Sequence, residues 1–372
     1  MKKSSFINKI FWLINLVSIA SLLLSYLSPF VNPKNFWLIS FFGLAYPVLL
    51  IVNGLFVIFW GLQWNRKALF SLIIILTGWL NIGKTAQVNI NNSAPEKSDS
   101  TAIFKVMSYN VRLFNLYNWT KNKETTNKIF DLLQEESPDI ICFQEFYHSD
   151  KKDYFVTIDS LKKTLKAKNY HVEYTIVKRG TGHWGMATFS TYPIVKKEKI
   201  SFGGKFNNIC IYSDIKIGND TIRVYNLHLS SIGLSPEDYE LINDISDYKD
   251  SNEIKRTTGV LRRLKRAFVK RAKQTHLITE SLKNCPYPIV VCGDFNDTPV
   301  SYSYKEIAEN LSDAFIESGN GFGKTYIGKL PSFRIDYILH SKDLKSYEFL
   351  TLPDTLSDHY PVTCFLEMPV RN

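Results

Sequence analysis

Polar residues of the kinds that bind metal ions and transfer protons stand at the ends of short apolar runs in this sequence. Val, Ile and aromatic residues make up the runs, and Gly, Asn, Asp or Pro bound them, as expected for buried strands. If the strand ends meet at one rim of a sheet, the cost of gathering carboxylates and imidazoles there is offset by a cation or an anionic substrate. Metal-assisted hydrolysis of a phosphodiester uses this combination. The residues are Asn110, Glu145, His228, Asp294, Asn296, Asp336, Asp358 and His359.

Strand-like runs and two helical segments are expected to position these residues. The helical segments are residues 125–136 and 269–283, where apolar residues recur at helical spacing. This set of elements agrees with an α/β fold. The strand-like runs lie near Phe104, Ile140, Glu173, Met186, Ile209, Ile222, Ile289, Ile335 and Val362.

Several short motifs follow one another along the chain. They are Gln144-Glu145, the segment 185–194, Asn226-Leu227-His228-Leu229, Gly293-Asp294-Phe295-Asn296, Arg334-Ile335-Asp336-Tyr337 and Ser357-Asp358-His359. One of them alone would be weak support, whereas all of them in this order are specific. From about Phe104 to Leu366 the chain resembles the endonuclease/exonuclease/phosphatase superfamily. The resemblance implies a four-layer α/β sandwich, in which two mostly antiparallel sheets pack face to face with helices outside.

The resemblance also implies a divalent-metal site, for which Glu145 is the best ligand. Mg²⁺ or Mn²⁺ prefers carboxylate oxygen and keeps waters and substrate phosphate as its other ligands. Asn110 and Asp358 complete or support that shell, unless they only close a strand and cap a turn. Family members often carry a further acid shortly after the Asn110 position, where this chain has Val111-Arg112-Leu113. The choice between one metal ion and two stays open.

The catalytic roles that the resemblance implies fall on five residues. Asp294 orients or deprotonates the attacking water, and Asn296 donates to a phosphate oxygen. Asp336 pairs with His359, which fixes the ring tautomer and favours an imidazolium that faces the phosphoryl oxygens. His228 stabilises the leaving group or protonates it as a general acid.

Substrate contacts are expected from Asn110, Asn226 and His183. His183 and Trp184 precede the Gly185 strand in a Gly-rich loop, where they could touch substrate. The alternative is that a loop Trp simply packs against its neighbours.

The N-terminal region contains three apolar stretches, residues 10–33, 35–65 and 68–83, that lack Asp, Glu, Lys and Arg. Their Leu, Ile, Phe and Trp content fits helices that cross a hydrocarbon core of about 30 Å. The sequence therefore predicts an all-α membrane region of three transmembrane helices. The alternative is a hairpin of two spans with an interfacial third segment, because the third stretch is near the short limit.

Basic residues precede the first stretch and follow the second, so the positive-inside bias puts the N-terminus and the second loop in the cytoplasm. With three spans, everything after Lys84 faces outward. This predicts a multi-pass protein of the plasma or inner membrane with an extracytoplasmic catalytic domain. Residues 85–101, rich in Asn, Ser, Lys and Glu, are expected to form a flexible linker. The expected division is 1–84 for the anchor, 85–101 for the linker and 102–372 for the catalytic domain.

The net charge of the chain is divided between the N-terminal region and the remainder. Of 45 Lys and Arg, six lie in the first 83 residues, which leaves 39 against 35 acidic residues, or +4, in the remainder. A strongly basic nucleic-acid binder is not indicated. Residues 255–273 nevertheless contain nine Lys or Arg and no acid, with apolar residues at helical spacing. This predicts an amphipathic helix whose basic face is neutralised by the acidic residues 237–253, or contacts anionic lipid or a polyanionic substrate.

These features predict a membrane-anchored, divalent-metal-dependent phosphodiesterase or phosphatase. The family's substrates range from DNA to sphingomyelin and phosphoinositides, so fold and motif do not choose among them. A membrane anchor favours a lipid or lipid-linked phosphate headgroup, with the bilayer as a second partner. Two alternatives remain, which are an extracytoplasmic nuclease and a catalytically silent receptor or scaffold with the same fold.

Overall fold

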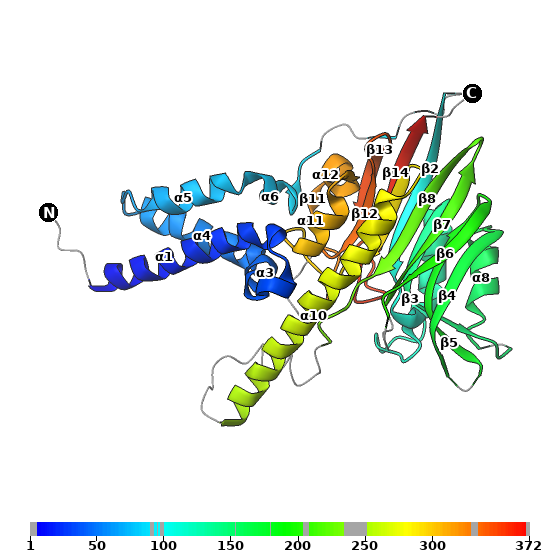
Figure 1. The fold of residues 1–372 in the computed structure, drawn as a ribbon, viewed down its shortest axis with the longest axis horizontal. Helices are drawn as coiled ribbons and strands as arrows, with labels where there is room; N and C mark the ends of the chain where they lie inside the picture. Colours follow the sequence, from blue (N-terminus) through cyan, green and yellow to red (C-terminus); the bar gives the residue numbers. More distant parts are fainter. Residues whose placement is uncertain are drawn as a thin grey trace.

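The computed structural model describes residues 6–89, 93–94, 96, 100–152, 154–178, 180–203, 208–233, 251–328 and 334–369, with the side chains of 251–256 left out. Two six-stranded sheets face each other (Figure 1). Sheet I has the order β13 (Lys345–Thr351), β14 (Val362–Pro369), β2 (Thr101–Asn110), β3 (Ile140–Ser149), β5 (Gly182–Ser190) and β4 (Asn169–Lys178). Sheet II has the order β10 (Leu311–Asp313), β12 (Asp336–Ser341), β9 (Ile289–Asp294), β8 (Asp220–His228), β7 (Ile209–Ile217) and β6 (Ile194–Ser201).

Both sheets are mostly antiparallel, and their central strands, such as β3, β8 and β9, are buried on both faces. Among the described strands, the pairs β2–β3 and β8–β9 run parallel. Val290 and Cys292 of β9 pack between the sheets, whereas Ile289 and Val291 pack on the opposite face. Because successive side chains point to opposite faces, a strand covered on both sides is a continuous apolar run. The short runs in the sequence therefore mark strands.

Helices cover the outer faces of the two sheets. Sheet I is covered by α7 (Thr125–Glu136) and α8 (Thr157–Thr164), and sheet II by α10 (Ser251–Lys283) and α11 (Tyr302–Ala308). The short helix α12 (Ala314–Ser318) packs beside β13. The order helix, sheet, sheet, helix confirms the predicted four-layer α/β sandwich.

Helix α10 joins both predicted segments, 255–273 and 269–283, into one helix of 33 residues. Of the apolar residues predicted to form its stripe, Leu264, Phe268 and Ala272 are buried, whereas Leu261 is exposed. The basic residues do not all lie on the outer face, because Arg271 is fully buried and pairs with Asp297. The acidic segment 237–253 lies outside the described side chains.

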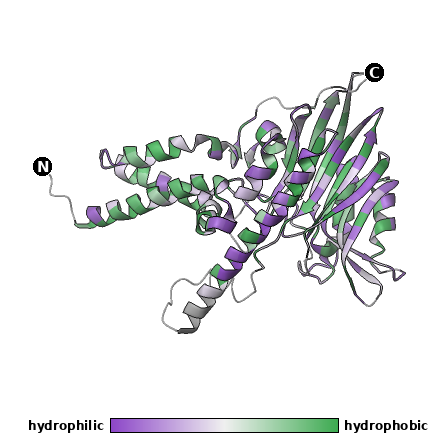
Figure 2. Ribbon diagram, in the orientation of Figure 1, coloured by the Kyte–Doolittle hydropathy of each residue, from purple (hydrophilic) through white to green (hydrophobic). Residues whose placement is uncertain are grey.

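A group of apolar helices precedes the sandwich (Figures 1 and 2). Buried polar contacts hold the group together, since Asn15 donates to Ser71 at 2.7 Å and Asn53 donates to Ser18 at 2.8 Å. The group comprises α1 (Phe6–Leu27), the 3₁₀ turn η1 (Ser28–Phe30), α2 (Pro33–Phe36), α3 (Leu38–Leu44), α4 (Tyr46–Gly61), α5 (Ala68–Thr77) and α6 (Trp79–Gly83).

The prediction of three transmembrane helices is wrong. In the part of the chain that the structure describes, Phe6–Phe30 is the one helix long and apolar enough to cross a membrane, and α3 with α4, bent by 65°, gives at most a second span. Helix α5 has 10 residues, ends at Thr77 and is capped by Gly78. A helix of that length rises about 15 Å, which is half of a hydrocarbon core. The predicted outward orientation depended on an odd number of spans, and we do not retain it.

The first residues of the predicted linker, 85–101, are paired with the sandwich. Strand β1 (Ala86–Gln87) pairs antiparallel with β11 (Gly321–Phe322), and Asn89 donates to the Gly319 carbonyl at 2.7 Å. The strand pairing and this side-chain hydrogen bond give the segment a fixed path that its polar composition did not predict. Linker residues 90–92, 95 and 97–99 lie outside the described residues.

The apolar helices also pack directly on the sandwich. Thr298 donates from Oγ1 to the Gly43 carbonyl at 3.2 Å, and Arg334 donates from Nη2 to the Lys84 carbonyl at 2.8 Å. Gly43 has no room for a side chain, because a Cβ atom would lie 2.5 Å from the carbonyl oxygen of Val300. The segment that follows β9 is therefore in contact with the N-terminal helices.

Candidate active site

Asp294 lies at the centre of the polar residues that the strand ends bring together. The parallel pair β8–β9 places His228 opposite Asp294, and the antiparallel β12 places Asp336 on its other side. Asn110, which ends β2 in the facing sheet, donates from Nδ2 to Asp294 Oδ2 at 3.1 Å. The Nε2 atoms of His228 and His359 lie 3.6 and 3.7 Å from the same oxygen. One rim of the two sheets thus carries a single cluster.

A strained turn after β9 presents Asp294 to this cluster. Gly293 has φ 145°, and a Cβ atom there would overlap the backbone of Leu227, so only glycine fits. Asn296 has φ 50°, an uncommon conformation outside glycine. Its backbone N–H donates to Asp294 Oδ1 at 2.8 Å, and its Nδ2 donates to Asp294 Oδ2 at 3.2 Å and to the Leu229 carbonyl at 3.0 Å. These bonds hold the carboxylate in one orientation.

Burial is the main influence on the Asp294 carboxyl, and it raises the pKa above the ordinary value. The charges of His359 and His228 and the N–H of Asn296 lower the pKa, and the charge of Asp336 raises it. The pKa stays raised, so this carboxylate takes up a proton more readily than an exposed one. A general base beside an attacking water needs that property.

His359 and Asp336 form a buried pair beside Asp294. The Nδ1 atom of His359 lies 2.9 and 3.1 Å from the two oxygens of Asp336. Burial lowers the pKa of His359, but the charges of Asp336 and Asp294 outweigh it and raise the pKa to about 10. The ring is therefore an imidazolium at neutral pH, with Nε2–H directed to the side of Asp294. An imidazolium in this place can stabilise negative charge on a phosphoryl oxygen.

Glu145 stands on a β-bulge at the same end of sheet I. The register between β3 and β5 shifts between Phe143 and Phe146, and Glu145 has φ 49°. Its half-buried carboxylate has no protein partner among the described residues. A bulge commonly re-aims a side chain beside an active site.

Asn226 supports this bulge rather than lining an open surface. It is 0% exposed, and its Nδ2 donates to the carbonyls of Phe143 at 3.2 Å and Ala187 at 2.9 Å. Its Oδ1 accepts from Gln144 Nε2 at 2.8 Å. The polar atoms of Asn226 are thus engaged between the two sheets, so the structure favours a positioning role over the predicted substrate contact.

Asp358 lies beside Asn110 and is partly exposed. Ser357 Oγ donates to the Asn110 carbonyl at 2.8 Å, and Arg112 Nε lies 3.4 Å from Asp358 Oδ2. Arg112 opens the 3₁₀ segment η2 (Arg112–Asn115), and its backbone N–H donates to Asn110 Oδ1 at 3.2 Å. Sequence reasoning assigned no role to Arg112. The available signal was a basic residue where relatives often have an acid.

Among the described residues, one group of side chains has the spacing of a metal site. Asp294, Asp336 and His359 have ligand atoms within 4.8 Å of one another, but a protonated His359 bonded to Asp336 has no lone pair to offer. Glu145 and Asp358 offer carboxylate oxygens, and Glu145 has no other described partner. Hard cations prefer such oxygens. The assignment of Glu145 and Asp358 as metal ligands stays a prediction. Asp358 also lies near Arg112, and both ends of the Asn110 side chain already hydrogen bond.

His183 is not part of the Asp294 cluster in the described structure. Its Nε2 lies 2.6 Å from Asp150 Oδ2, and its ring lies 6.1 Å from that of His148 and 4.6 Å from that of Tyr174. These partners account for its position at the start of β5, opposite His148 of β3. The predicted substrate contact of His183 stays a prediction.

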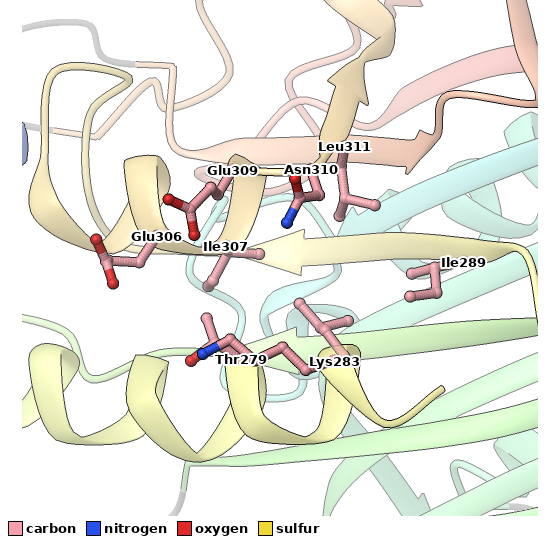
Figure 3. Close-up of a pocket in the computed structure, with 9 residues that line it drawn as sticks. Thr279, Lys283, Ile289, Glu306, Ile307, Glu309, Asn310 and Leu311 are labelled. Atoms are coloured by element: carbon pink, nitrogen blue, oxygen red, sulfur yellow. The ribbon is translucent and has the colours of Figure 1, made fainter. Parts of the chain in front are cut away.

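Cavities lie at both ends of the sandwich. One of about 660 Å³ borders β3 just beyond Glu145, where Tyr147 and Trp184 line it. Another of about 100 Å³ lies between α10, α11 and Ile289 (Figure 3). Ile289 begins β9, whereas Asp294 ends it, so the smaller cavity is remote from the cluster.

Comparison with known proteins agrees with this geometry. A family model described as the Endonuclease/Exonuclease/phosphatase family matches residues 107–359. A second model, described as a domain of unknown function, matches residues 8–85. No curated protein matches the chain.

Solved structures of similar fold cover most of the sandwich. An endonuclease/exonuclease/phosphatase family protein from Bacteroides thetaiotaomicron is 19% identical, with 73% of this chain and 99% of that chain covered and a TM-score of 0.53. A mannosyl-6-phosphatase from the same organism is 19% identical, with 71% and 99% covered and a TM-score of 0.50. ANGEL2, a 2′,3′-cyclic phosphatase, is 17% identical, with 74% and 98% covered and a TM-score of 0.50. At these identities the likeness shows the fold alone. Because the family model matches more than half of the sequence, the chain belongs to the endonuclease/exonuclease/phosphatase family, whose members hydrolyse phosphoester bonds.

Proposed function

We propose that the protein hydrolyses a phosphoric ester with the help of a divalent cation, Mg²⁺ or Mn²⁺, and that its substrate is a phosphate group carried by a membrane lipid. The observation that supports hydrolysis is the surroundings of one oxygen, Asp294 Oδ2. Two carboxamides lie 3.1 and 3.2 Å from it, and two imidazoles lie 3.6 and 3.7 Å from it. Donors gathered around one buried carboxylate suit proton transfer beside a developing negative charge.

In the proposed reaction, Asp294 takes a proton from water while the water oxygen bonds to phosphorus and the bond from phosphorus to the leaving oxygen breaks. The Asn296 carboxamide and the His359 imidazolium stabilise the negative charge on the phosphoryl oxygens. His228 gives a proton to the leaving oxygen. Glu145 and Asp358 would hold a divalent cation, which would polarise the phosphoryl group further.

The lipid part of the proposal rests on the N-terminal helices. Phe6–Phe30 is long and apolar enough to cross a membrane. The helices contact the segment that follows Asp294, through Thr298 and through Val300, which is buried among them. The same helices that enter a bilayer therefore hold the catalytic rim near its surface, where a lipid phosphate lies.

A substrate panel on the purified full-length protein in lipid nanodiscs tests this proposal. The panel holds a short soluble phosphodiester, a phospholipid, an inositol phosphate and duplex DNA, each with Mg²⁺ and with EDTA. Asp294→Asn and Glu145→Gln should each lower turnover at least about 100-fold. Glu198→Gln, on the exposed strand β6, is the matched control and should not change it.

Each arm of the panel separates one alternative. Turnover that survives EDTA or Asp294→Asn contradicts the metal-assisted mechanism. Hydrolysis of DNA alone supports the nuclease alternative in place of the lipid substrate. A protein that turns over no substrate, although its fold is intact, supports the receptor or scaffold alternative.

A further inference from the structure

A cavity of about 370 Å³ lies where the N-terminal helices meet the sandwich. Helix α4 contributes Leu50 and Ile51 to this junction cavity, and the segment after β9 contributes Pro299. On the other side, β11 and the residues after it contribute Phe322 and Lys324. The wall is mostly apolar, and parts of the chain that are far apart in sequence build it together.

One border of the junction cavity continues onto the apolar surface of α4. Ile51 is 63% exposed, and the exposed residues Leu55 and Ile58 follow it at helical intervals. Phe322 belongs to the sandwich but is 81% exposed at the same border. If α4 lies in a membrane, as the anchoring proposed above requires, this surface faces hydrocarbon. A lipid chain can then enter the cavity without crossing water.

The segment at the opposite border continues along the chain to residues that contact the catalytic cluster. Lys324 is followed by Thr325, whose hydroxyl accepts the backbone N–H of Asp336 at 3.1 Å. Next along the chain, the Tyr326 ring has its centroid 5.2 Å from that of His359. The segment that forms one wall of the junction cavity therefore also supports the Asp336–His359 pair.

Charge at the cavity wall is of one sign. Arg334 lines the cavity, but its Nη1 donates to Asp313 at 2.8 Å and its Nη2 donates to the Lys84 carbonyl at 2.8 Å. The half-buried Lys324 ammonium has no protein partner among the described residues. An apolar wall that carries an ammonium with no described partner is complementary to a hydrocarbon chain that ends in a phosphate.

We infer that the junction cavity binds one hydrocarbon chain of a lipid whose phosphate reaches Lys324 and the Asp294 cluster. The inference rests on the proposed function and names how its substrate is held. A chain that leaves the bilayer gains little hydrophobic free energy, because the bilayer is already apolar. The cavity therefore acts by fixing the position and orientation of the substrate, which raises the chance of reaction.

Photolabelling tests the inference without relying on turnover. Full-length protein is placed in nanodiscs that contain a phospholipid with a diazirine near the end of one chain, irradiated, and mapped by mass spectrometry. Pro299 is buried in the cavity wall, so its labelling reports entry of the chain. Ile51→Trp fills the entrance and should lower labelling of Pro299 about tenfold, equal to about 1.4 kcal/mol of binding. Ile58→Trp, on the same helix but outside the cavity, is the matched control and should not change it.

The outcomes separate the cavity from the proposed reaction. Absence of Pro299 labelling in the wild type, or equal labelling in Ile51→Trp, overturns the inference. Phe322→Ser removes the opposite wall and should also lower labelling, which keeps the test valid if Ile51→Trp does not fold. Labelling of Pro299 without hydrolysis of any phosphate ester contradicts the proposed function while supporting the cavity. Hydrolysis of phospholipid without Pro299 labelling contradicts the cavity alone.

Discussion

Replacing Arg271 with methionine removes a positive charge that the protein holds out of water. Arg271 is 0% exposed, and it donates from Nε to Asp297 at 3.0 Å and from Nη1 to the Ser230 carbonyl at 2.9 Å. The two acceptors follow β9 and β8, the strands that end in Asp294 and His228. Loss of Arg271 should therefore affect both the stability of the fold and the placement of the catalytic side chains.

The expected loss of stability follows from the buried partner. Removing one member of a buried ion pair costs about 3–5 kcal/mol, because the other charge stays in a region of low dielectric. Burial raises the pKa of Asp297, while the Arg271 charge lowers it, so the substitution raises that pKa further. The folded variant then binds a proton more tightly than its unfolded chain. It should gain stability as pH falls and lose stability as pH rises through the Asp297 pKa.

Thermal unfolding in nanodiscs, followed by near-ultraviolet circular dichroism, measures the effect. The midpoint for Arg271→Met should fall by roughly 10 °C, and by less at lower pH. Arg266→Met, at an exposed position of the same helix, should leave it unchanged. The double variant Arg271→Met/Asp297→Asn should recover most of the loss, because no unpaired charge remains. The reasoning is refuted if Arg271→Met unfolds within about 2 °C of the wild type, or if the double variant is less stable than the single one.

Other substitutions test the site itself. Asp336→Asn removes the charge that, against the lowering effect of burial, raises the pKa of His359 to about 10. The stability from the His359–Asp336 pair is fully present below a pH of about 6.5 and is lost as pH rises through the folded pKa of His359. The alkaline limb of the pH–rate profile should therefore move to lower pH in the variant. An unmoved limb contradicts the assigned role of Asp336. Gly293→Ala puts a Cβ atom against the Leu227 carbonyl at φ 145°, so the free energy of unfolding, measured with denaturant, should fall by about 3 kcal/mol. A fall below about 1 kcal/mol contradicts the steric argument. Asn226→Ala loosens the bulge that carries Glu145 and should raise the Mg²⁺ concentration for half-maximal rate about tenfold. An unchanged Mg²⁺ concentration contradicts the positioning role of Asn226.

Much of the candidate site was visible in the sequence because apolar runs show where strands stop. His228 and Asp294 end their strands and Asp336 begins one, and the structure brings all three together. Asn226 stands inside a strand, yet nothing in its motif shows that the side chain spans both sheets. Arg112 approaches Asp358 from 246 residues away, and such a distant contact has no local pattern.

In the N-terminal region too, the sequence showed local features but not how the chain packs. Hydropathy correctly marked three apolar stretches, but the number of helices able to span a membrane depends on where the backbone breaks, at the bend between α3 and α4 and at Gly78. Composition likewise suggested a free linker, whereas β1 pairs with β11.

By itself, the sequence determined the family, the sandwich and most of the chemical groups, because strand periodicity and residue type are local properties of the chain. The tertiary structure alone decided that two carboxamides and two imidazoles surround one oxygen of Asp294, that Arg271 is buried, and that apolar helices form a cavity beside the catalytic segment. These features depend on the packing of segments distant in sequence, and packing between such segments leaves no periodic signal within either one.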